Sequence, residues 1–233
     1  MQPLAITWYG HSTFLIRTPG GKRVLFDPWL RGNPACPEAL KKPPRADAIL
    51  ASHGHGDHID DLIACARDSG APVVAVYELC DWLERKGLKN LLPMNKGGSL
   101  DVAGLRVTMT AASHSSGYVD EGRMVYMGEA AGFILRLEDG RSIYFAGDTD
   151  LFGDMRLIGE LYQPAIAFLP IGDRFTMGPS AAARACAMLG VKQVVPMHHS
   201  TFPLLSGTPE QLEQHLAGKG IEVLRLKPGE TAQ

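Results

Sequence analysis

His53-Gly54-His55-Gly56-Asp57-His58 follows directly on the short apolar stretch Ala48-Ile49-Leu50-Ala51-Ser52. This hexapeptide holds three of the eight histidines in the 233-residue chain, together with one carboxylate. If the apolar stretch is a buried strand, the hexapeptide leaves it at the edge of a sheet, where neighbouring side chains can converge. Gly54 and Gly56 lack a Cβ, so the chain can turn tightly without bulk between the ligand groups. Imidazole and carboxylate groups bind zinc, manganese and iron readily, and the segment therefore predicts a metal site.

A flexible His-rich tract that binds metal adventitiously is the alternative interpretation. The glycines between the histidines and a helix expected over residues 59–69 favour a built site. The motif remains a hypothesis that its structural context has to confirm.

Length and charge limit the class of protein. A chain of 233 residues can form one α/β domain with an ample core, and we expect a single domain over residues 1–233. With 23 Lys+Arg against 25 Asp+Glu, the formal charge is −2, so no global basic field favours nucleic acid. Residues 1–8 lack the basic start and apolar core of a signal peptide, and no apolar run approaches a membrane span. We expect a cytoplasmic protein without a membrane partner. Nucleic acid is not excluded as a partner but has no support, and a small molecule is the expected substrate.

The four cysteines, Cys36, Cys65, Cys80 and Cys186, are scattered and form no C-x-x-C pair. Three of them lie in helix-like apolar contexts. This pattern predicts buried free thiols rather than disulfides or a cysteine metal site.

Alternating and apolar runs predict the order of secondary structure. A β-rich segment comes first, with strands at 4–8, 12–17 and 22–27, and a proline-rich loop over 28–45 follows it. A strand–helix series comes next, with strands at 48–52 and 72–76 and helices at 59–69 and 77–86. Such a series indicates parallel strands covered by helices.

The second part of the chain repeats this order. Its β-rich segment has strands at 99–102, 105–112, 132–137 and 142–146, with a hairpin turn at 138–141. Its strand–helix series has helices at 151–161, 179–189 and 209–217 and strands at 165–169, 193–196 and 222–226. The succession predicts two similar halves that pack sheet on sheet, with the helices outside.

Three further candidate ligands follow predicted strands. His114 comes after the strand at 105–112, Asp148 after the strand at 142–146, and His198 after the strand at 193–196. In each case an apolar strand delivers a ligand-type residue into a loop, as in α/β enzymes that build sites on rigid scaffolds. Together with the hexapeptide, these residues predict a site assembled from distant strand ends.

At this point the chain resembles the metallo-β-lactamase superfamily, and the resemblance covers essentially its whole length. More narrowly, it is similar to a small group of metal-dependent hydrolases related to ascorbate-6-phosphate lactonase. The segments that carry the resemblance, beside the hexapeptide, are Tyr9-Gly10-His11-Ser12-Thr13-Phe14, Phe26-Asp27-Pro28, Gly147-Asp148-Thr149, residues 170–179 and His198-His199-Ser200-Thr201-Phe202-Pro203. The resemblance implies a four-layer αββα sandwich and a hydrolase.

The resemblance also implies a ligand set for two divalent cations, with Zn2+ favoured and Mn2+ or Fe as alternatives. His53, His55 and His114 would bind one metal, Asp57, His58 and His198 the second, and Asp148 would bridge them. Two such cations can hold a hydroxide, polarise the substrate oxygen and stabilise developing negative charge. Asp57 and Asp148 would therefore belong to the catalytic machinery as well as to the ligand set.

Three residues near this set have two interpretations each. Asp27 either orients a histidine through the second N–H of that ring or starts the turn at Pro28. His11 either lies at the site or is a hydrogen-bonded core histidine. His199 competes with His198 for one ligand position, and we favour His198 as the ligand. His199 then either lines the pocket, where it could be a proton donor to the leaving group, or simply packs.

Four other features are expected near the site or on the surface. Asp173 would bond a ligand histidine or hold its loop, with Thr176 in the same loop, and Arg174 would meet an anionic substrate. The segment 117–129 would form a lid or a subunit contact in a homo-oligomer, and His215 would lie on the surface.

Three other functions are alternatives to a hydrolase. A di-iron redox protein is disfavoured because relatives with that chemistry usually carry a carboxylate where this chain has His55. A nuclease has no support from charge or length. A non-catalytic module that kept its metal site for stability or sensing is the third alternative, although every ligand position holds a competent residue.

Overall fold

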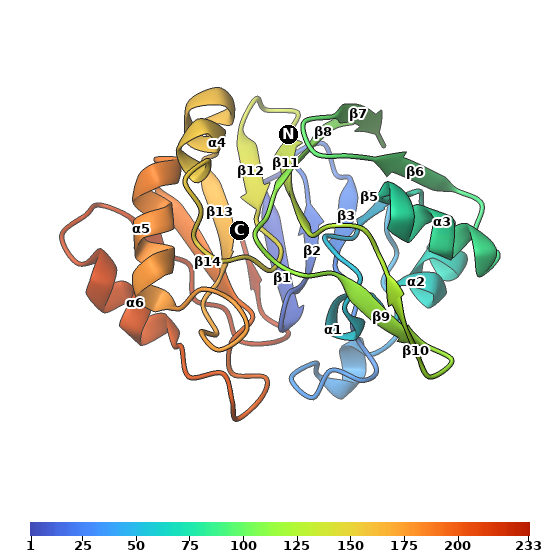
Figure 1. The fold of residues 1–233 in the computed structure, drawn as a ribbon. Helices are drawn as coiled ribbons and strands as arrows, with labels where there is room; N and C mark the ends of the chain where they lie inside the picture. The colour runs from blue at the N-terminus through green and yellow to red at the C-terminus, as the bar shows by residue number, and fades with distance from the viewer.

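Two seven-stranded mixed sheets form the centre of the protein, whose computed structural model describes residues 1–233 (Figure 1). The first sheet has the strand order β16-β1-β2-β3-β4-β5-β6. Its strands are β1 (Ala5–Gly10), β2 (Thr13–Arg17), β3 (Arg23–Phe26), β4 (Ala48–Leu50), β5 (Val73–Val76), β6 (Leu91–Met94) and β16 (Thr231–Ala232). Antiparallel pairing from β16 to β3 changes to parallel pairing from β3 to β6.

The second sheet repeats this change of direction. Its order is β15-β14-β13-β12-β11-β8-β7, antiparallel from β7 to β12 and parallel from β12 to β15. The strands are β7 (Ser99–Val102), β8 (Leu105–Ala111), β11 (Ala131–Arg136), β12 (Ser142–Phe145), β13 (Ile166–Pro170), β14 (Gln193–Met197) and β15 (Glu222–Val223). The two halves expected from element order are therefore present, each with an antiparallel and a parallel part.

Aromatic side chains join the inner faces of the two sheets. Phe14 and Phe26 of the first sheet contact Phe145 of the second, with ring centroids 6.4 and 4.4 Å apart, and Phe14 also lies 4.9 Å from Phe168. All four rings are fully buried and belong to one core of 62 buried residues. Burial of this size dominates the favourable free energy of folding and fixes the sheets relative to each other.

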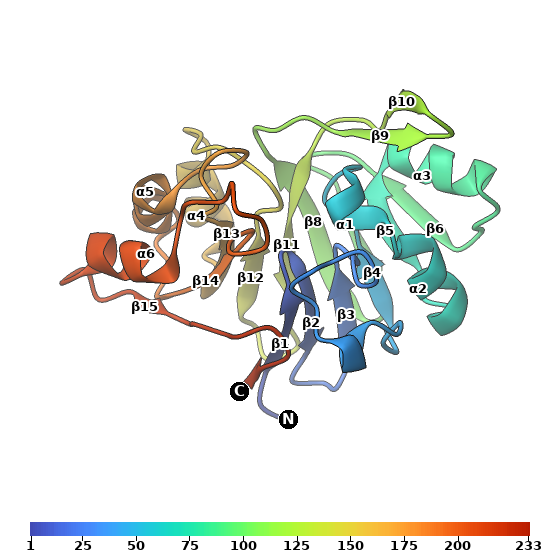
Figure 2. The same ribbon diagram turned by 90° about the horizontal axis from the view of Figure 1, so that it is seen from below.

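Helices cover the outer faces. α1 (Gly56–Ile59), α2 (Leu62–Ser69) and α3 (Tyr77–Arg85) lie on the side of the first sheet, and α4 (Met155–Tyr162), α5 (Pro179–Leu189) and α6 (Pro209–Leu216) on the side of the second (Figure 1). The result is the predicted four-layer αββα arrangement. Figure 2 shows the two chain ends close together, where β16 pairs with β1.

Several boundaries differ from the sequence prediction. The helix expected over 59–69 is two helices, because the chain breaks at Asp61, whose carboxylate accepts hydrogen bonds from the backbone N–H groups of Leu30 and Arg31 over 2.6 and 2.9 Å. β6 contains Pro93 and lies at a sheet edge, so its pattern is weak. β16 has two residues, too few for any period.

Part of the segment 117–129 is a strand pair. β9 (Gly117–Asp120) and β10 (Arg123–Tyr126) form a separate antiparallel ribbon. The side chain of Asp120 accepts hydrogen bonds from Trp82 of α3 over 2.9 Å and from Lys86, which directly follows α3, over 2.8 Å, and these contacts fix the ribbon on that helix.

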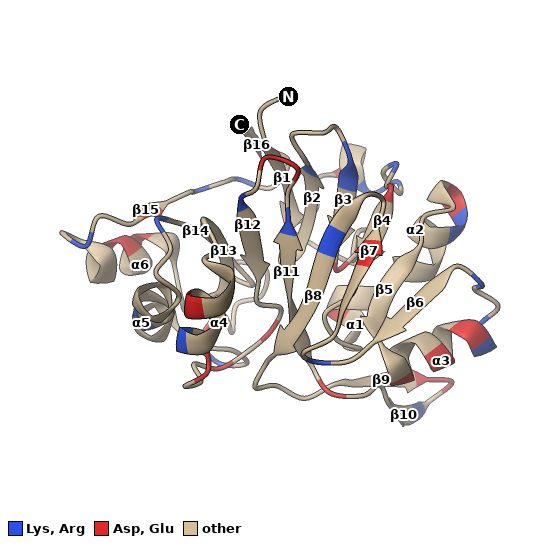
Figure 3. Ribbon diagram, turned by 90° about the horizontal axis from the view of Figure 1, so that it is seen from above, with Lys and Arg blue, Asp and Glu red and all other residues tan.

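Charged side chains of both signs are spread over the helices and strand ends (Figure 3). None of the helices has the length and apolar character that crossing a membrane requires.

Candidate metal centre

The hexapeptide lies where parallel strands β3 and β4 end side by side. Asp27 follows β3, and the chain after β4 turns through His53 and His55 into α1. Gly54 is required at this turn, because a Cβ there would lie 2.3 Å from the Cβ of Met127. The close packing of this turn therefore involves Met127, a residue from the second half of the chain.

Asp148 lies at the centre of the predicted ligands. Its Oδ2 atom is 2.9 Å from Nε2 of His198, 3.3 Å from Nε2 of His58, 3.6 Å from Nε2 of His114 and 4.0 Å from Nε2 of His53. These histidines come from three separate parts of the chain, and the carboxylate is 2 % exposed. The tertiary fold thus brings the distant strand ends to one point.

Three groups of nitrogen and oxygen atoms lie close enough to bind metal. The fully buried group of Asp27, His53 and His58 shares one residue with each of the other two. One consists of His53, His55 and His114, and in it Nδ1 of His55 lies 2.9 Å from Nε2 of His53. The other consists of Asp57, His58, His198 and His11. The division is the one expected from the resemblance, with His11 added to the second group.

Asp27 supports two predicted ligands, His58 directly and His53 through Ser52. Its Oδ2 atom accepts a hydrogen bond from Nδ1 of His58 over 2.8 Å, and its Oδ1 accepts one from the backbone N–H of Ser52 over 2.7 Å. The Ser52 hydroxyl donates to Asp27 over 2.6 Å and lies 3.0 Å from Nδ1 of His53. Both histidines are thereby oriented with Nε2 toward Asp148. The contact with His58 favours the orienting interpretation of Asp27.

Burial sets the protonation of this cluster. It lowers the pKa of His53 far below its ordinary value, and also lowers the pKa of His55 and of His114. Burial opposes ionisation of Asp148, yet His198 and His58 hold its pKa well below the usual range. Burial likewise opposes protonation of His58, whereas Asp148 and Asp27 raise its pKa well above the usual value. His53, His55 and His114 are thus neutral imidazoles and Asp148 is a carboxylate, the forms that bind metal. His58 instead holds a proton in the metal-free protein, which a bound cation would displace.

The donor set fits a metal on a further observation. Buried His58 Nε2, His198 Nδ1 and Asp148 Oδ1 have no hydrogen-bond partner within the protein. Leaving such atoms unpaired in the interior is costly, and buried polar atoms are rarely left without partners. For His58 and Asp148, a cation between the ring nitrogens and the carboxylate would supply the missing interaction.

A pocket of about 440 Å³ opens over the cluster. Five of its lining residues are predicted ligands, and the other four are Ser115, Arg174, Phe175 and Phe202. Arg174 forms no ion pair with a carboxylate of the protein, and its guanidinium lies 5.8 Å from the Phe175 ring centroid. Sequence reasoning placed Arg174 near substrate but gave no role to the two phenylalanines, although both lie in segments that carry the resemblance.

His199 lies elsewhere. Positive φ angles of 52° and 58° at its neighbours His198 and Ser200 turn the chain sharply, and His199 packs 5.0 Å from the Trp8 ring and lines a different pocket of about 520 Å³. Burial lowers the pKa of His199 to about 4. The structure therefore places His198, and not His199, in the ligand cluster; a proton-donor role for His199 stays a prediction without support from this placement.

The other flanking residues have structural contacts. Asp173 accepts a hydrogen bond from Ser206 over 3.2 Å and contacts its own loop, rather than a ligand histidine. His215 is exposed on α6, as expected. Val119, Met124 and Tyr126 of the ribbon are large exposed apolar side chains. A homo-oligomer stays a prediction, which light scattering of the purified protein would test.

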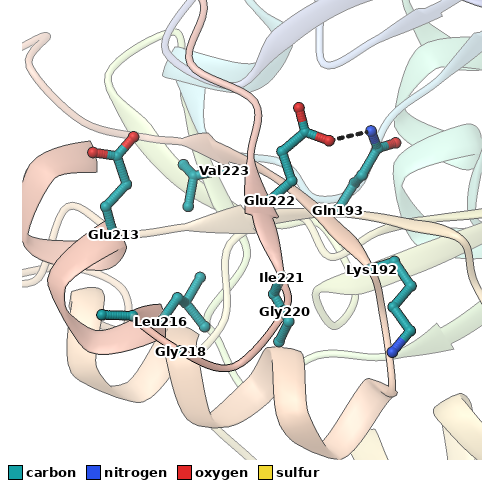
Figure 4. Close-up of a pocket in the computed structure, with 10 residues that line it drawn as sticks. Lys192, Gln193, Glu213, Leu216, Gly218, Gly220, Ile221, Glu222 and Val223 are labelled. Carbon is teal, nitrogen blue, oxygen red and sulfur yellow. Dashed lines mark hydrogen bonds between the residues drawn. The ribbon is translucent and has the colours of Figure 1, made fainter.

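A larger hollow of about 630 Å³ lies away from this chemistry, between α6, β14 and β15 (Figure 4). Its lining includes no histidine, and Glu222 accepts a hydrogen bond from Gln193 over 2.7 Å at one side. We therefore take the smaller pocket over the histidine cluster as the candidate site.

Comparison with known proteins gives consistent matches. Residues 22–199 match a family model described as a β-lactamase superfamily domain. The chain is 51% identical over 230 residues to a UPF0173 metal-dependent hydrolase of Solibacter usitatus, covering 99% of this chain and 100% of the relative. It is 50% identical to one of Rubrobacter xylanophilus, covering 97% and 94%. A solved metallo hydrolase of the archaeon Ignicoccus hospitalis is 34% identical, with a TM-score of 0.87 over 98% of this chain and 97% of that one.

Proposed function

Because the chain belongs to the metallo-β-lactamase superfamily and to its metal-dependent hydrolases, we propose that it is a two-metal enzyme that cleaves a small ester, lactone or phosphoester. The observation that carries this proposal is the position of Asp148 Oδ2 within 4.0 Å of Nε2 atoms from both ligand groups. A carboxylate in that position suits a bridge between two cations. His53, His55 and His114 would hold one cation, and Asp57, His58 and His198 the other.

The metals would supply the central chemistry. When bound, two divalent cations would hold a hydroxide between them, polarise the substrate oxygen and stabilise the negative charge that develops on it. Zn2+ is the expected metal, with Mn2+ or Fe as alternatives, since imidazole and carboxylate ligands suit all three.

The protein's own residues supply orientation and selection. Asp27 and Ser52 fix the rings of His58 and His53, which keeps Nε2 of each ring free for the site. Phe175 and Phe202 give the pocket an apolar wall, and Arg174 is the one permanent side-chain cation among its lining residues. Such a lining would take a compact substrate with an apolar part and favour one that carries an anionic group.

The test is turnover by the purified protein loaded separately with Zn2+, Mn2+ or Fe2+. Panels of lactones, carboxylic esters and phosphodiesters should reveal hydrolysis in at least one class. Asp148→Asn should abolish it, while His215→Asn, which removes an exposed histidine on α6, should leave it unchanged. Two bound metals without turnover on any panel would contradict the enzyme and favour a sensing module. Turnover with one metal per chain would contradict the dinuclear mechanism.

A further inference from the structure

We infer that His11 is a positioning residue for the second metal group: it holds Asp57 through its side chain and His198 through its backbone. This inference rests on the proposed pair of metal sites. It adds to the predicted ligands a supporting residue from the β1–β2 turn, far from the hexapeptide in sequence.

The side chain of His11 ends at Asp57. Its Nε2 atom lies 3.1 Å from Oδ2 of Asp57, and its ring is completely buried. An ionised carboxylate only accepts hydrogen bonds, so Nε2 carries the hydrogen and donates it. Asp57 is partly exposed to the pocket, and a donor on one oxygen limits the directions in which its carboxylate can face a cation.

The backbone of His11 contacts His198, another member of the second metal group. Its carbonyl oxygen accepts a hydrogen bond from the backbone N–H of His198 over 3.1 Å, and the rings of His11 and His198 have centroids 4.0 Å apart. The indole N–H of Trp8 donates to the same carbonyl over 2.9 Å, which fixes it. One residue therefore contacts two members of the predicted second group.

Asp57 determines which ring nitrogen of His11 carries the hydrogen, because its carboxylate accepts at Nε2 and a neutral ring has only one N–H. The Thr201 hydroxyl, which donates to the carbonyl oxygen of His199 over 3.2 Å, also lies 2.9 Å from Nδ1 of His11 and shares its hydrogen with that nitrogen. Nδ1 then accepts, and Nε2 remains the donor to Asp57. In this arrangement His11 does not bind the metal itself, because Nε2 has no free lone pair.

The backbone at His11 provides a matched pair of substitutions. His11 has a φ of 54°, in the left-handed region that asparagine tolerates better than most residues. In His11→Asn the backbone fits and the amide reaches only the place of Nδ1, so the contact with Asp57 is lost. In His11→Gln the backbone fits less well, but the longer amide can place an N–H at the position of Nε2. A purely structural role favours Asn, whereas a positioning role favours Gln.

The experiment measures metal content and affinity rather than turnover. Each protein is dialysed against buffered Zn2+ and its metal per chain is determined by mass spectrometry; Mn2+-loaded samples are examined by EPR for coupling between the two ions. We expect two Zn2+ per wild-type chain and a second-site affinity about 10- to 100-fold weaker in His11→Asn, the usual cost of losing a partner that orients a ligand. The same variant should show the EPR spectrum of an isolated Mn2+, and His11→Gln should stay close to wild type in both measurements.

Thr201 gives a second route that leaves His11 in place, in case both His11 variants fail to fold. Thr201→Val removes the hydroxyl and should weaken the second site, whereas Thr201→Ser keeps it and should not. Second-site affinity unchanged in His11→Asn, or in Thr201→Val, would overturn the inference, as would equal losses in His11→Asn and His11→Gln. Wild-type protein that binds a single metal would overturn the two-metal proposal and this inference together; two metals that His11→Asn retains would overturn the inference alone.

Discussion

Nδ1 of His58 lies 2.8 Å from Oδ2 of Asp27, and both side chains are completely buried. The carboxylate follows β3, and the imidazole lies in α1, which comes after the neighbouring parallel strand β4. The contact therefore joins the segments that follow two adjacent strands. It fixes the ring with Nε2 facing Asp148 at 3.3 Å.

Asp27→Asn should weaken metal binding about 10- to 100-fold, because the amide cannot accept the hydrogen bonds of both Ser52 and His58. Competition with a chromophoric chelator gives the affinity. Asp47→Asn removes a carboxylate that pairs with Arg23 at the surface and serves as the control. Equal affinities in the two variants would contradict an orienting role for Asp27.

Asp148→Asn should reduce bound metal below two per chain and lower turnover by at least about 100-fold. The amide that replaces the Asp148 carboxylate has no negative charge for two cations to share. Mass spectrometry under non-denaturing conditions measures the stoichiometry. A variant that keeps both metals and normal affinity would exclude Asp148 as the bridge.

Removing the metals should lower the melting temperature of the protein. A ligand that binds only the folded state stabilises it by about 2.7 kcal/mol at a free concentration 100 times its Kd. Calorimetry of chelator-treated and reloaded samples measures the change. Identical melting curves would argue against a metal centre built into the fold.

The metal-free protein should lose stability as the pH falls below 6.5. Burial lowers the pKa of His11 and of His199 from the ordinary value of 6.5 to about 4. Between pH 4 and pH 6.5 the unfolded chain therefore binds protons at these histidines that the native state does not. The free energy of unfolding therefore falls with decreasing pH, by on the order of 3 kcal/mol per group when the whole interval is crossed.

His199→Phe should make this pH dependence shallower, because the ring that packs on Trp8 no longer titrates. Denaturant unfolding at several pH values measures the slope, and His215→Asn is the matched control. Equal slopes in wild type and His199→Phe would count against a buried neutral His199. A loss of turnover in His199→Phe with intact metal content would instead support the proton-donor role.

The four thiols should resist modification in the folded protein. Burial raises the pKa of Cys36 to about 11 and of Cys65, Cys80 and Cys186 to about 12, so almost no thiolate exists near neutral pH. A chromogenic disulfide reagent should release colour slowly from native protein and rapidly in denaturant. Fast reaction of a native thiol would identify local opening around it.

Much of the ligand set could be predicted from local sequence. The hexapeptide follows a buried strand, and His114, Asp148 and His198 follow others, so their placement depended on strand assignment alone. His11 could not be assigned in this way, because its role depends on Asp57 and Thr201, which meet it only in the folded protein. The resemblance left His11 either at the site or in the core, and neither interpretation names the side chains that its ring contacts.

The ribbon β9–β10 and the break between α1 and α2 were also missed for a tertiary reason. The ribbon is stabilised by its contacts with α3 and the residue that follows it, and the helix break by the hydrogen bonds that Asp61 accepts from the backbone of Leu30 and Arg31. Neither interaction produces a periodic pattern of residues in the local sequence, because each joins segments far apart in the chain.

The sequence by itself determined the strands, the alternation of β-rich and strand–helix segments, and the residue types able to bind metal, because periodicity and side-chain chemistry are local properties. Only the tertiary structure decided which nitrogen of each imidazole faces Asp148, that His198 and not His199 joins the cluster, and that His11 lies against Asp57. These outcomes depend on hydrogen bonds and packing between segments up to 190 residues apart, such as His11 with Thr201.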